Sequence, residues 1–396
     1  MIYVIGLHHL EDLGPRLREL ISRAEVLAGG KRHLALLASH PAEKILLSPL
    51  EKALGEIRKK KEARVVILTS GDPLFFGLGR RLLEEFPPED LVFYPAPTAM
   101  QLAFARLRLS WEDARFISFH GRSPQNVHLE IAPYQKVAFF TDPQNTPSRI
   151  ASYLLEKGIS GKAFVCENLG LAEERIVGLP LEEVRGKRFS ALNLMVLLKE
   201  AQPRRLLFGL PEEHYQHERG LITKAEVRAV VISALAPFPE ATVWDLGAGS
   251  GAVGLELAGL AFRGQTFLVE KEASRVKLLR KNLFLTKLDN VEIIESSIKE
   301  ALPSLPSPDL IFVGGGFGDL IEEASSFLRS LKKDTRLVAT FVVFEHLLKA
   351  LDFCQTLGFK TSFSALFLAR GKVFPDGGRG LLSQNPVFIL KAWRQR

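Results

Sequence analysis

Short apolar runs of strand length alternate along the chain with longer stretches in which apolar residues recur at helical spacing. The run RVVILT at 64–69 is nearly continuous, as expected of a parallel strand that is buried on both faces. In the first half the pattern predicts an early helix at 12–27 and strands at 2–7, 64–69, 92–94, 116–120, 137–141, 163–167 and 192–198. The last three strands have little predicted helix between them, so this half should begin as α/β and end as a more mixed sheet.

The alternation breaks at AQPRR, residues 201–205, and then resumes. We place a domain boundary there, which gives domains 1–203 and 204–396. The second domain should contain strands at 242–246, 266–270, 291–295, 309–313 and 337–343, with helices at 223–235, 251–260, 273–285, 320–331 and 345–357. The final strands, 361–369 and 387–392, have no helix between them and should pair antiparallel at a sheet edge.

Regular alternation of strands and helices predicts the α/β fold class for both domains. We expect an N-terminal α/β domain followed by a doubly wound, Rossmann-like sheet with an antiparallel edge. Such sheets bind ligands beyond the carboxyl ends of their strands. The loops that follow the strands are therefore the places to look for chemistry.

The composition narrows the class of protein. Of 396 residues, 46% are hydrophobic and 24% charged, which excludes a disordered, collagen-like or coiled-coil chain. No apolar run approaches the roughly 18 residues of a membrane span, and no basic region precedes the first apolar stretch, as a signal peptide would require. Two cysteines are too few for a disulfide framework or a zinc cage. We expect a soluble, cytoplasmic protein with no membrane partner and no bound metal.

The formal net charge is +7, from 52 Lys and Arg against 45 Asp and Glu. This balance suits a polyanionic partner, either nucleic acid or a small molecule with many carboxylates. An RNA-binding surface would favour basic stripes interleaved with aromatic residues, whereas most of the 27 phenylalanines lie in runs that we expect to be buried. We therefore expect no nucleic-acid partner.

The strongest local signal is VWDLGAGSGAVG, residues 243–254. Gly247, Gly249 and Gly251 follow a predicted strand directly and open a predicted helix. Glycine lets the backbone turn sharply and approach a ligand without a Cβ in the way, and the helix N-terminus favours an anionic group. Glu270 ends the next strand, 19 residues after Gly251, where it can accept hydrogen bonds from ribose hydroxyls.

Three interpretations compete for this turn. The segment 249–254 also satisfies the dinucleotide pattern G-x-G-x-x-G, and a purely structural glycine turn is the third possibility. Asp245 favours S-adenosylmethionine, because a carboxylate at this strand end repels a pyrophosphate but can hold the amino group of a methionine moiety.

The arrangement resembles motif I of the Rossmann-like methyltransferases. The resemblance implies that Thr223 lies over the cofactor, that Ser297 and Ile298 flank its adenine, and that methyl donor and acceptor meet near Gly314. The glycines at 314–316 also fit a turn with unusual dihedral angles. The implied cofactor residues of this domain are Thr223, Asp245, Gly247, Ala248, Gly249, Ser250, Gly251, Glu270, Ser297, Ile298 and Gly314.

In the first domain, TSGDPLFFGLG at 69–79 carries a predicted buried strand into Gly71-Asp72-Pro73 and then into a helix that begins near Leu74. Proline suits the start of a helix, where its missing N–H costs nothing. Taken alone, this segment also fits an ordinary capped turn. Further loop motifs follow later strands at 95–99, 140–143 and 165–169.

In this order, GDPLFFG, PTAMQLAFARL, FTDPQNTP and VCENLG resemble the tetrapyrrole methylase family, specifically its cobalamin-pathway branch that methylates carbon 5 of a precorrin. Residues 205–396, with GLITKAEVRA, DLGAGSGAV, VEKE, FVGGG and GGRGLLSQNPV, resemble the methyltransferase that methylates carbon 15 and removes a carboxyl group. Together they cover essentially the whole chain. The cofactor residues implied in the first domain are Gly71, Asp72, Pro73, Leu74, Thr98, Ala99, Thr141 and Leu169.

One departure from the family concerns the first loop, where Gly6 is followed by Leu7-His8-His9 instead of further glycines. The two histidines either face the substrate or occupy surface or cap positions. In the second domain, His214 and His217 share one helical face, but two histidines without a third ligand do not make a metal site.

The resemblance implies a C-methyltransferase that uses S-adenosylmethionine and a precorrin or cobalt-precorrin substrate, and that assembles as a homo-oligomer. Methyl transfer from a sulfonium needs mainly alignment of donor and acceptor, so we assign no catalytic residue. Lys224, Arg370 and Arg379 are candidate clamps for the substrate's carboxylates, although each also fits a solvated surface charge. A non-catalytic cofactor sensor is the alternative from another class, and two intact donor sites in one chain argue against it.

Overall fold

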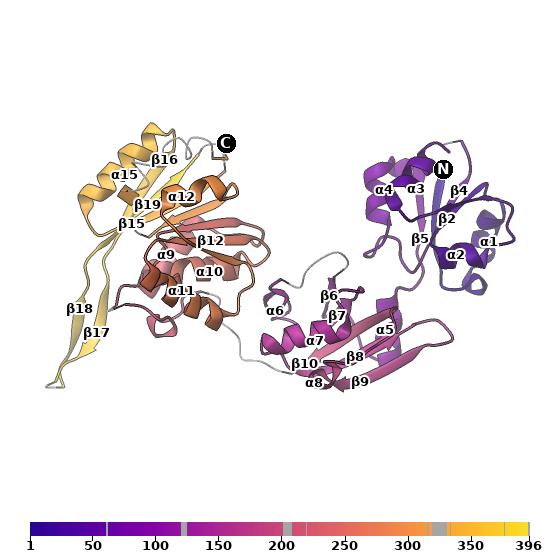
Figure 1. Cartoon of the computed structure of the whole chain (residues 1–396), viewed down its shortest axis with the longest axis horizontal. Coiled ribbons are helices and arrows are strands. Elements are labelled where there is room, and N and C mark those ends of the chain that lie inside the picture. Colours follow the sequence, from indigo (N-terminus) through magenta and orange to yellow (C-terminus); the bar gives the residue numbers. More distant parts are fainter. Residues whose placement is uncertain are drawn as a thin grey trace. The chain divides into compact units, whose positions relative to one another are not determined.

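The computed structural model describes residues 1–60, 62–119, 125–200, 208–218, 220–314, 317–318, 331–332, 334–375 and 377–394. The chain divides into two compact units, and Figure 1 labels most of their helices and strands. The first unit comprises Met1–Pro124 and Pro133–Gln202, and the second comprises Gln125–Ala132 and Pro203–Arg396. The expected break at 201–205 lies outside the described residues.

Within its described residues, the first unit contains a parallel sheet of five strands in the order β3-β2-β4-β1-β5. Its strands are β1 (Ile2–Gly6), β2 (Val26–Gly29), β3 (Glu43–Leu46), β4 (Val65–Thr69) and β5 (Leu91–Tyr94). The associated helices are η1 (Leu10–Asp12), α1 (Pro15–Ser22), α2 (Lys31–Leu36), α3 (Leu50–Arg58), α4 (Gly79–Glu85) and η2 (Pro88–Asp90). The central strand β4 is buried on both faces, with Ile67 packed in one core and Val66 in the other, as its continuous apolar run predicted.

The helix predicted at 12–27 is confirmed over Pro15–Ser22 but is wrong at both ends. The structure ends α1 at Ser22 and forms the buried strand β2 from Val26–Gly29. β2 pairs with β3 on one side and with β4 on the other, and all four of its residues are buried. This burial between two strands favours the strand over the helix that the apolar pattern suggested. The strand β3 was not predicted, because only Ile45 of its residues is buried.

A second sheet of the first unit is mixed, with the strand order β6-β7-β10-β8-β9 in the described residues. Its strands are β6 (Ala114–Ser118), β7 (Lys136–Phe140), β8 (Gly161–Glu167), β9 (Arg175–Pro180) and β10 (Asn193–Lys199). The helices here are α5 (Ala99–Leu107), α7 (Pro147–Glu156) and α8 (Leu181–Val184). The mixed character is confirmed, since β6 and β7 are parallel while β10 runs antiparallel to β7 and β8. The expectation of little helix between the last strands is wrong, because α7 lies between β7 and β8.

The second unit contains a sheet of seven described strands in the order β13-β12-β11-β14-β15-β19-β16. Its strands are β11 (Thr242–Leu246), β12 (Gln265–Glu270), β13 (Val291–Glu295), β14 (Leu310–Val313), β15 (Arg336–Phe341), β16 (Lys360–Leu366) and β19 (Val387–Trp393). The helices are η3 (Glu212–His214), α9 (Ala225–Leu235), α10 (Ala252–Leu260), α11 (Ala273–Thr286), α12 (Ile298–Ala301), η4 (Leu302–Ser304) and α15 (Phe344–Thr356). The first five strands are parallel and β19 is antiparallel to β15 and β16, which confirms the predicted sheet with its antiparallel edge. The helix predicted at 320–331 falls almost wholly outside the described residues.

An unpredicted hairpin, β17 (Ala369–Val373) and β18 (Arg379–Ser383), separates β16 from β19. In the described part of the chain its strands pair only with each other. Figure 1 shows this ribbon extending away from the seven-stranded sheet of its own unit. The single strand predicted at 361–369 is therefore wrong at its end, because the chain leaves the sheet after Leu366.

The short helix α6 (Val127–Glu130) belongs by its contacts to the second unit, although it lies between β6 and β7 in the sequence. The Asn126 backbone N–H donates to Asp289 Oδ2 at 3.1 Å, and the Asp289 N–H donates to Asn126 Oδ1 at 2.8 Å. Arg263 adds an ion pair with Glu130 at 2.9 Å. The division at 203/204 did not anticipate this inserted segment.

The two cysteines lie one in each unit, Cys166 in β8 and Cys354 in α15. Both thiols are buried, and burial raises the pKa of each to about 12. Among the described helices, none has both the length and the apolar character required to cross a membrane.

Candidate functional sites

The glycine turn after β11 opens a cavity in the second unit. Gly247, Gly249 and Gly251 all have positive φ, at 76°, 58° and 77°, in the left-handed region that favours glycine. A Cβ on Gly251 would lie 2.0 Å from Leu279 Cδ1, so this glycine is required by helix packing. A Cβ on Gly249 would meet nothing within 4 Å, so this glycine leaves open space in front of the turn.

Two carboxylates brace this turn from behind. Glu270 accepts hydrogen bonds from the N–H of Gly249 at 2.8 Å and of Glu272 at 2.9 Å. Asp245 accepts one from the Gly254 N–H at 2.9 Å, and its Oδ1 has no partner. Only 1% of Asp245 is exposed, and burial raises the pKa of its carboxyl to about 7. Glu270 thus contacts the glycine turn and Asp245 contacts the first turn of α10, and their role toward a ligand stays a prediction.

The cavity has a volume of about 440 Å³ and lies at the carboxyl ends of β11, β14 and β15, as expected for this fold. One wall is the segment 220–224, which precedes α9. The sequence-predicted residues that line it are Thr223, Lys224, Gly247, Ala248, Gly249, Ser250 and Gly314. The other predicted cofactor residues are not among its described lining: Asp245, Gly251, Glu270, Ser297 and Ile298.

Ser297 and Ile298 begin α12 instead of lining this cavity. Ser297 forms a capping box with Glu300, whose backbone N–H donates to the serine hydroxyl at 3.3 Å. Ile298 is 7% exposed and belongs to the hydrophobic core. Arg275 and Thr340 do line the cavity, and sequence reasoning missed both. The only signal for Arg275 is its place in the helix that follows Glu270.

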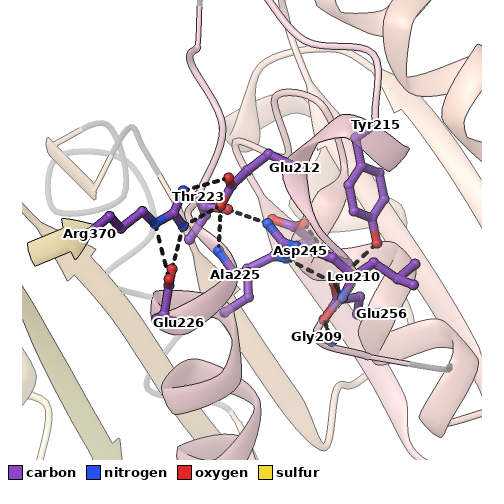
Figure 2. A network of polar contacts seen from close by, with 12 residues as sticks. Gly209, Leu210, Glu212, Tyr215, Thr223, Ala225, Glu226, Asp245, Glu256 and Arg370 are labelled. Atoms are coloured by element: carbon purple, nitrogen blue, oxygen red, sulfur yellow. Dashed lines mark hydrogen bonds and ion pairs between the residues drawn. The ribbon is translucent and has the colours of Figure 1, made fainter. Parts of the chain in front are cut away.

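A buried ion pair contacts the 220–224 wall through the Thr223 carbonyl, and Figure 2 labels its acidic member, Glu256. Arg228 Nε donates to Glu256 Oε1 at 2.9 Å, and both side chains are fully buried. Arg228 also donates to the backbone carbonyls of Thr223 and Leu210. Glu256 in turn accepts from Tyr215 Oη at 3.2 Å. The pair therefore fixes the chain that forms the wall, and its sequence signal was one acidic residue in the otherwise apolar helix AVGLELAGL.

Arg370 does not point freely toward a substrate. It forms a bidentate pair with Glu212 at 2.8 and 2.9 Å and a second pair with Glu226 at 2.5 and 3.0 Å. Arg379 lies exposed on β18 and is not among the described lining of the cavity. Of the three predicted clamps, Lys224 is the one that lines it.

The first unit also contains a cavity, of about 190 Å³, which we call the first cavity, and we call the cavity of the second unit the second cavity. Gly71 has a φ of 62°, and a Cβ there would lie 3.1 Å from Thr98 Cα. Gly6 packs against this turn so closely that a Cβ would lie 1.8 Å from the Gly71 carbonyl oxygen. The sequence-predicted residues that line this cavity are Gly71, Asp72, Thr98, Ala99 and Leu169.

Three predicted residues of this unit are not among the described lining. Pro73 shapes the turn, and Leu74 is 53% exposed. Thr141 is buried, and its hydroxyl donates to the Asn193 carbonyl at 2.8 Å. Asp72 Oδ1 accepts from the Leu74 N–H at 2.8 Å, so the Gly-Asp-Pro turn is also internally capped.

Polar side chains gather at one side of this cavity. His8 lines it and donates from Nε2 to the Pro97 carbonyl at 2.7 Å. Arg32 donates to Ser70 Oγ at 2.9 Å, and that hydroxyl lies 3.2 Å from His33 Nε2. Burial, together with the positive charge of Arg32, lowers the pKa of His33 to about 4. Sequence reasoning missed Arg32, Ser70 and His33, because they come together only when β2 pairs with β4.

Comparison with known proteins matches the two halves separately. Residues 1–185 match the model of the tetrapyrrole (corrin/porphyrin) methylases, and residues 213–370 match that of the precorrin methyltransferase domain. A cobalt-precorrin-7 C(5)-methyltransferase from Salmonella typhimurium is 35% identical over 50% of this chain and 100% of its own length. A probable cobalt-precorrin-6B C(15)-methyltransferase (decarboxylating) from Sulfurisphaera tokodaii is 35% identical over 46% of this chain and 95% of its own length.

One relative spans both halves. The precorrin-6Y C(5,15)-methyltransferase [decarboxylating] of a Sinorhizobium species is 34% identical over 98% of this chain and 94% of its own length. With two family models in the same order and a cavity in each unit, the chain belongs to the precorrin-6Y C(5,15)-methyltransferase (decarboxylating) family.

Proposed function

We propose that this chain is an S-adenosylmethionine-dependent C-methyltransferase of cobalamin biosynthesis. Its domain 1–203 methylates carbon 5 of a precorrin, and its domain 204–396 methylates carbon 15 and removes a carboxyl group from a ring acetate. The observation that carries the proposal is the presence of two cavities, each built on a glycine turn at the end of a parallel strand. The names of the relatives that match each half support the assignment of carbon 5 to the first domain and of carbon 15 to the second.

The second cavity suits the cofactor because of the space in front of Gly249. That space, together with the N-terminus of α10 behind it, lets backbone N–H groups approach an anionic group. We propose that Gly247, Gly249, Ser250 and Thr223 hold S-adenosylmethionine, which supplies an electrophilic methyl group. Asp245 and Glu270 contribute by holding the turn in shape.

The first cavity would hold a second molecule of the same cofactor. Gly71 and Thr98 form its floor through the close approach of their backbones, and Leu169 supplies an apolar wall. Arg32 at its side carries a positive charge suited to a carboxylate arm of the substrate.

In these reactions the main task of the protein is to align the methyl donor with the acceptor carbon. Well-oriented reactants can lower a barrier by about 7–11 kcal/mol without any acid or base. Loss of carbon dioxide needs an electron sink, and the conjugated nitrogens of a tetrapyrrole supply one within the substrate itself. We propose that Lys224 binds a carboxylate arm at the second cavity, that the substrate is a precorrin or its cobalt form, and that the chain works as a homo-oligomer.

Mass spectrometry of the full chain with S-adenosylmethionine and a purified precorrin intermediate tests the proposal. We expect the product to gain two methyl groups and lose one carbon dioxide. A substrate that returns unchanged would overturn the proposed function. Strong, salt-dependent binding to structured RNA would favour a nucleic-acid methylase instead.

A further inference from the structure

The Arg370 clamp, which we define as Arg370 with Glu212 and Glu226, joins three segments that are far apart in the sequence. Arg370 lies in β17 at the base of the hairpin, Glu212 begins η3, and Glu226 lies in the first turn of α9. Figure 2 shows the guanidinium between the two carboxylates, and four hydrogen bonds of 2.5 to 3.0 Å connect them. Bidentate contacts of this kind fix orientation as well as distance.

The clamp holds the chain on both sides of the cavity wall. Glu212 lies before the wall segment 220–224, and its Oε1 also accepts a hydrogen bond from the Ala225 N–H at 2.8 Å, directly after that segment. Arg228 secures the wall from inside through the Thr223 carbonyl. Glu212, which precedes the wall, is thus tied to Ala225 directly after it, and through Arg370 to the hairpin.

The clamp is charged at neutral pH. The Arg370 guanidinium lowers the pKa of Glu212 to about 2 and also lowers the pKa of Glu226. The Arg370 side chain is 35% exposed, so the clamp lies at the protein surface and is not required to fill the core. Its loss should therefore alter the wall without unfolding the sheet.

We propose that Arg370 is a positioning residue for the carbon-15 reaction: by joining the hairpin base to Glu212 and Glu226, it holds the wall 220–224 against the bound methyl donor. This inference rests on the proposed function of the second cavity. Coupling between two sites is reciprocal. Binding of the donor in the cavity should accordingly stabilise the base of the hairpin, although the described lining of the cavity does not include Arg370.

The test is calorimetric titration of the full chain with S-adenosylhomocysteine, comparing the wild type with Arg370→Gln. We expect one of two binding events to weaken roughly tenfold or more, while the event in the first unit stays unchanged. Glu226→Gln removes one of the two carboxylates from a residue that is 42% exposed and should give an intermediate loss. Lys372→Gln, in the same strand and outside the described clamp, is the matched control and should bind like the wild type.

Steady-state kinetics distinguishes a positioning role of Arg370 from a general loss of structure in the variant. In Arg370→Gln the KM for S-adenosylmethionine in the carbon-15 reaction should rise roughly tenfold and kcat at saturating donor should change less, with carbon-5 methylation preserved. Arg370→Lys keeps the charge and should recover only part of the affinity, because it cannot make two bidentate pairs. A titration curve of Arg370→Gln that superimposes on that of the wild type would overturn the inference. A wild-type chain that binds no ligand in the second unit would overturn the proposed function instead.

Discussion

The glycines of the turn after β11 have different structural roles, although the sequence does not distinguish them. The pattern G-x-G-x-G predicted the sharp turn, because no other residue type favours a positive φ at all three positions. The packing around each glycine could not be predicted, because it depends on Leu279, which reaches the turn from another helix. The structure separates Gly251, which is required for packing, from Gly249, which borders the cavity.

Gly251→Ala and Gly249→Ala should therefore fail in different ways. The first adds a methyl group 2.0 Å from Leu279 Cδ1 and should lower the free energy of unfolding by at least about 2 kcal/mol. The second should cost only about 1–2 kcal/mol in backbone strain and weaken binding of S-adenosylhomocysteine, because its methyl group enters the cavity. Denaturant unfolding and calorimetry measure the two effects. Equal losses of stability in both variants would contradict this distinction.

The buried carboxyl of Asp245 should make the stability of the second unit depend on pH. Its carboxyl pKa is raised from 3.8 to about 7 in the folded chain, so the folded state keeps a proton that the unfolded state has lost between these values. The contribution of the Asp245 carboxyl to the free energy of unfolding is therefore largest below about pH 4, and this contribution is lost as the pH rises through 7. Asp245→Asn should flatten this slope, which hydrogen exchange of β11 amides between pH 5 and pH 8, corrected for the intrinsic rate, can measure. An unchanged slope would show that other groups set it.

The sequence predicted which residues surround the sites better than it predicted what they contact. Most of the glycine turn and Thr223 line the second cavity, but the buried carboxylates accept hydrogen bonds from backbone N–H groups, Glu270 from Gly249 in the turn and Asp245 from Gly254 in α10. Arg370 resembled a free cation in the sequence because its partners lie 144 and 158 positions away. Pairings over such distances carry no local sequence signal.

At the scale of secondary-structure elements, burial decided which ones could be predicted. Strands β11 to β14 match their predicted bounds to within a residue, since their apolar runs are bounded by clear turns. The strand β9 and the hairpin of β17 and β18 were missed because most of their residues are exposed or only partly buried. An exposed strand has little hydrophobic pattern to read.

The helices α9 and α10 depend on the buried pair of Arg228 and Glu256. Removing one partner leaves an uncompensated buried charge, so Arg228→Met should cost about 3–5 kcal/mol of unfolding free energy. Replacing both, as in Arg228→Met with Glu256→Leu, should cost less than the sum of the single changes. Denaturant unfolding of the four chains gives the coupling energy. Strictly additive losses would mean that the two side chains do not stabilise each other.

At the scale of the whole molecule, the assignment of each reaction to one domain followed from motifs that each lie within one half of the sequence. The predicted sheets and their order along the chain were largely right for the same reason. The assignment of 125–132 to the second unit could not be predicted, because Asn126 and Asp289 are 163 positions apart. Hydrogen bonds between residues so far apart in the sequence become visible only in the structure.

Two separate cavities predict that each reaction can be removed alone. Gly71→Ala combines a φ of 62° with a Cβ only 3.1 Å from Thr98 Cα, and should abolish methylation at carbon 5 while carbon 15 is still methylated and carbon dioxide is still lost. Gly249→Ala should have the opposite outcome on a suitable substrate. Product masses distinguish the two, and calorimetry of the wild type should give two bound molecules of S-adenosylhomocysteine per chain. Loss of both reactions from either change would contradict independent sites.

The placement of one cysteine in each unit provides a pair of natural reporters. Both cysteines are at most 2% exposed and have a pKa near 12, so each reacts with an alkylating reagent mainly after its surroundings open. Cys166 also lines the cavity of the first unit, so a ligand bound there should shield it directly. A pulse of iodoacetamide followed by peptide mapping would thus report separately how often the regions around Cys166 and Cys354 open. The same native chain, without an engineered label, could then reveal whether a ligand bound in one half slows opening of the other.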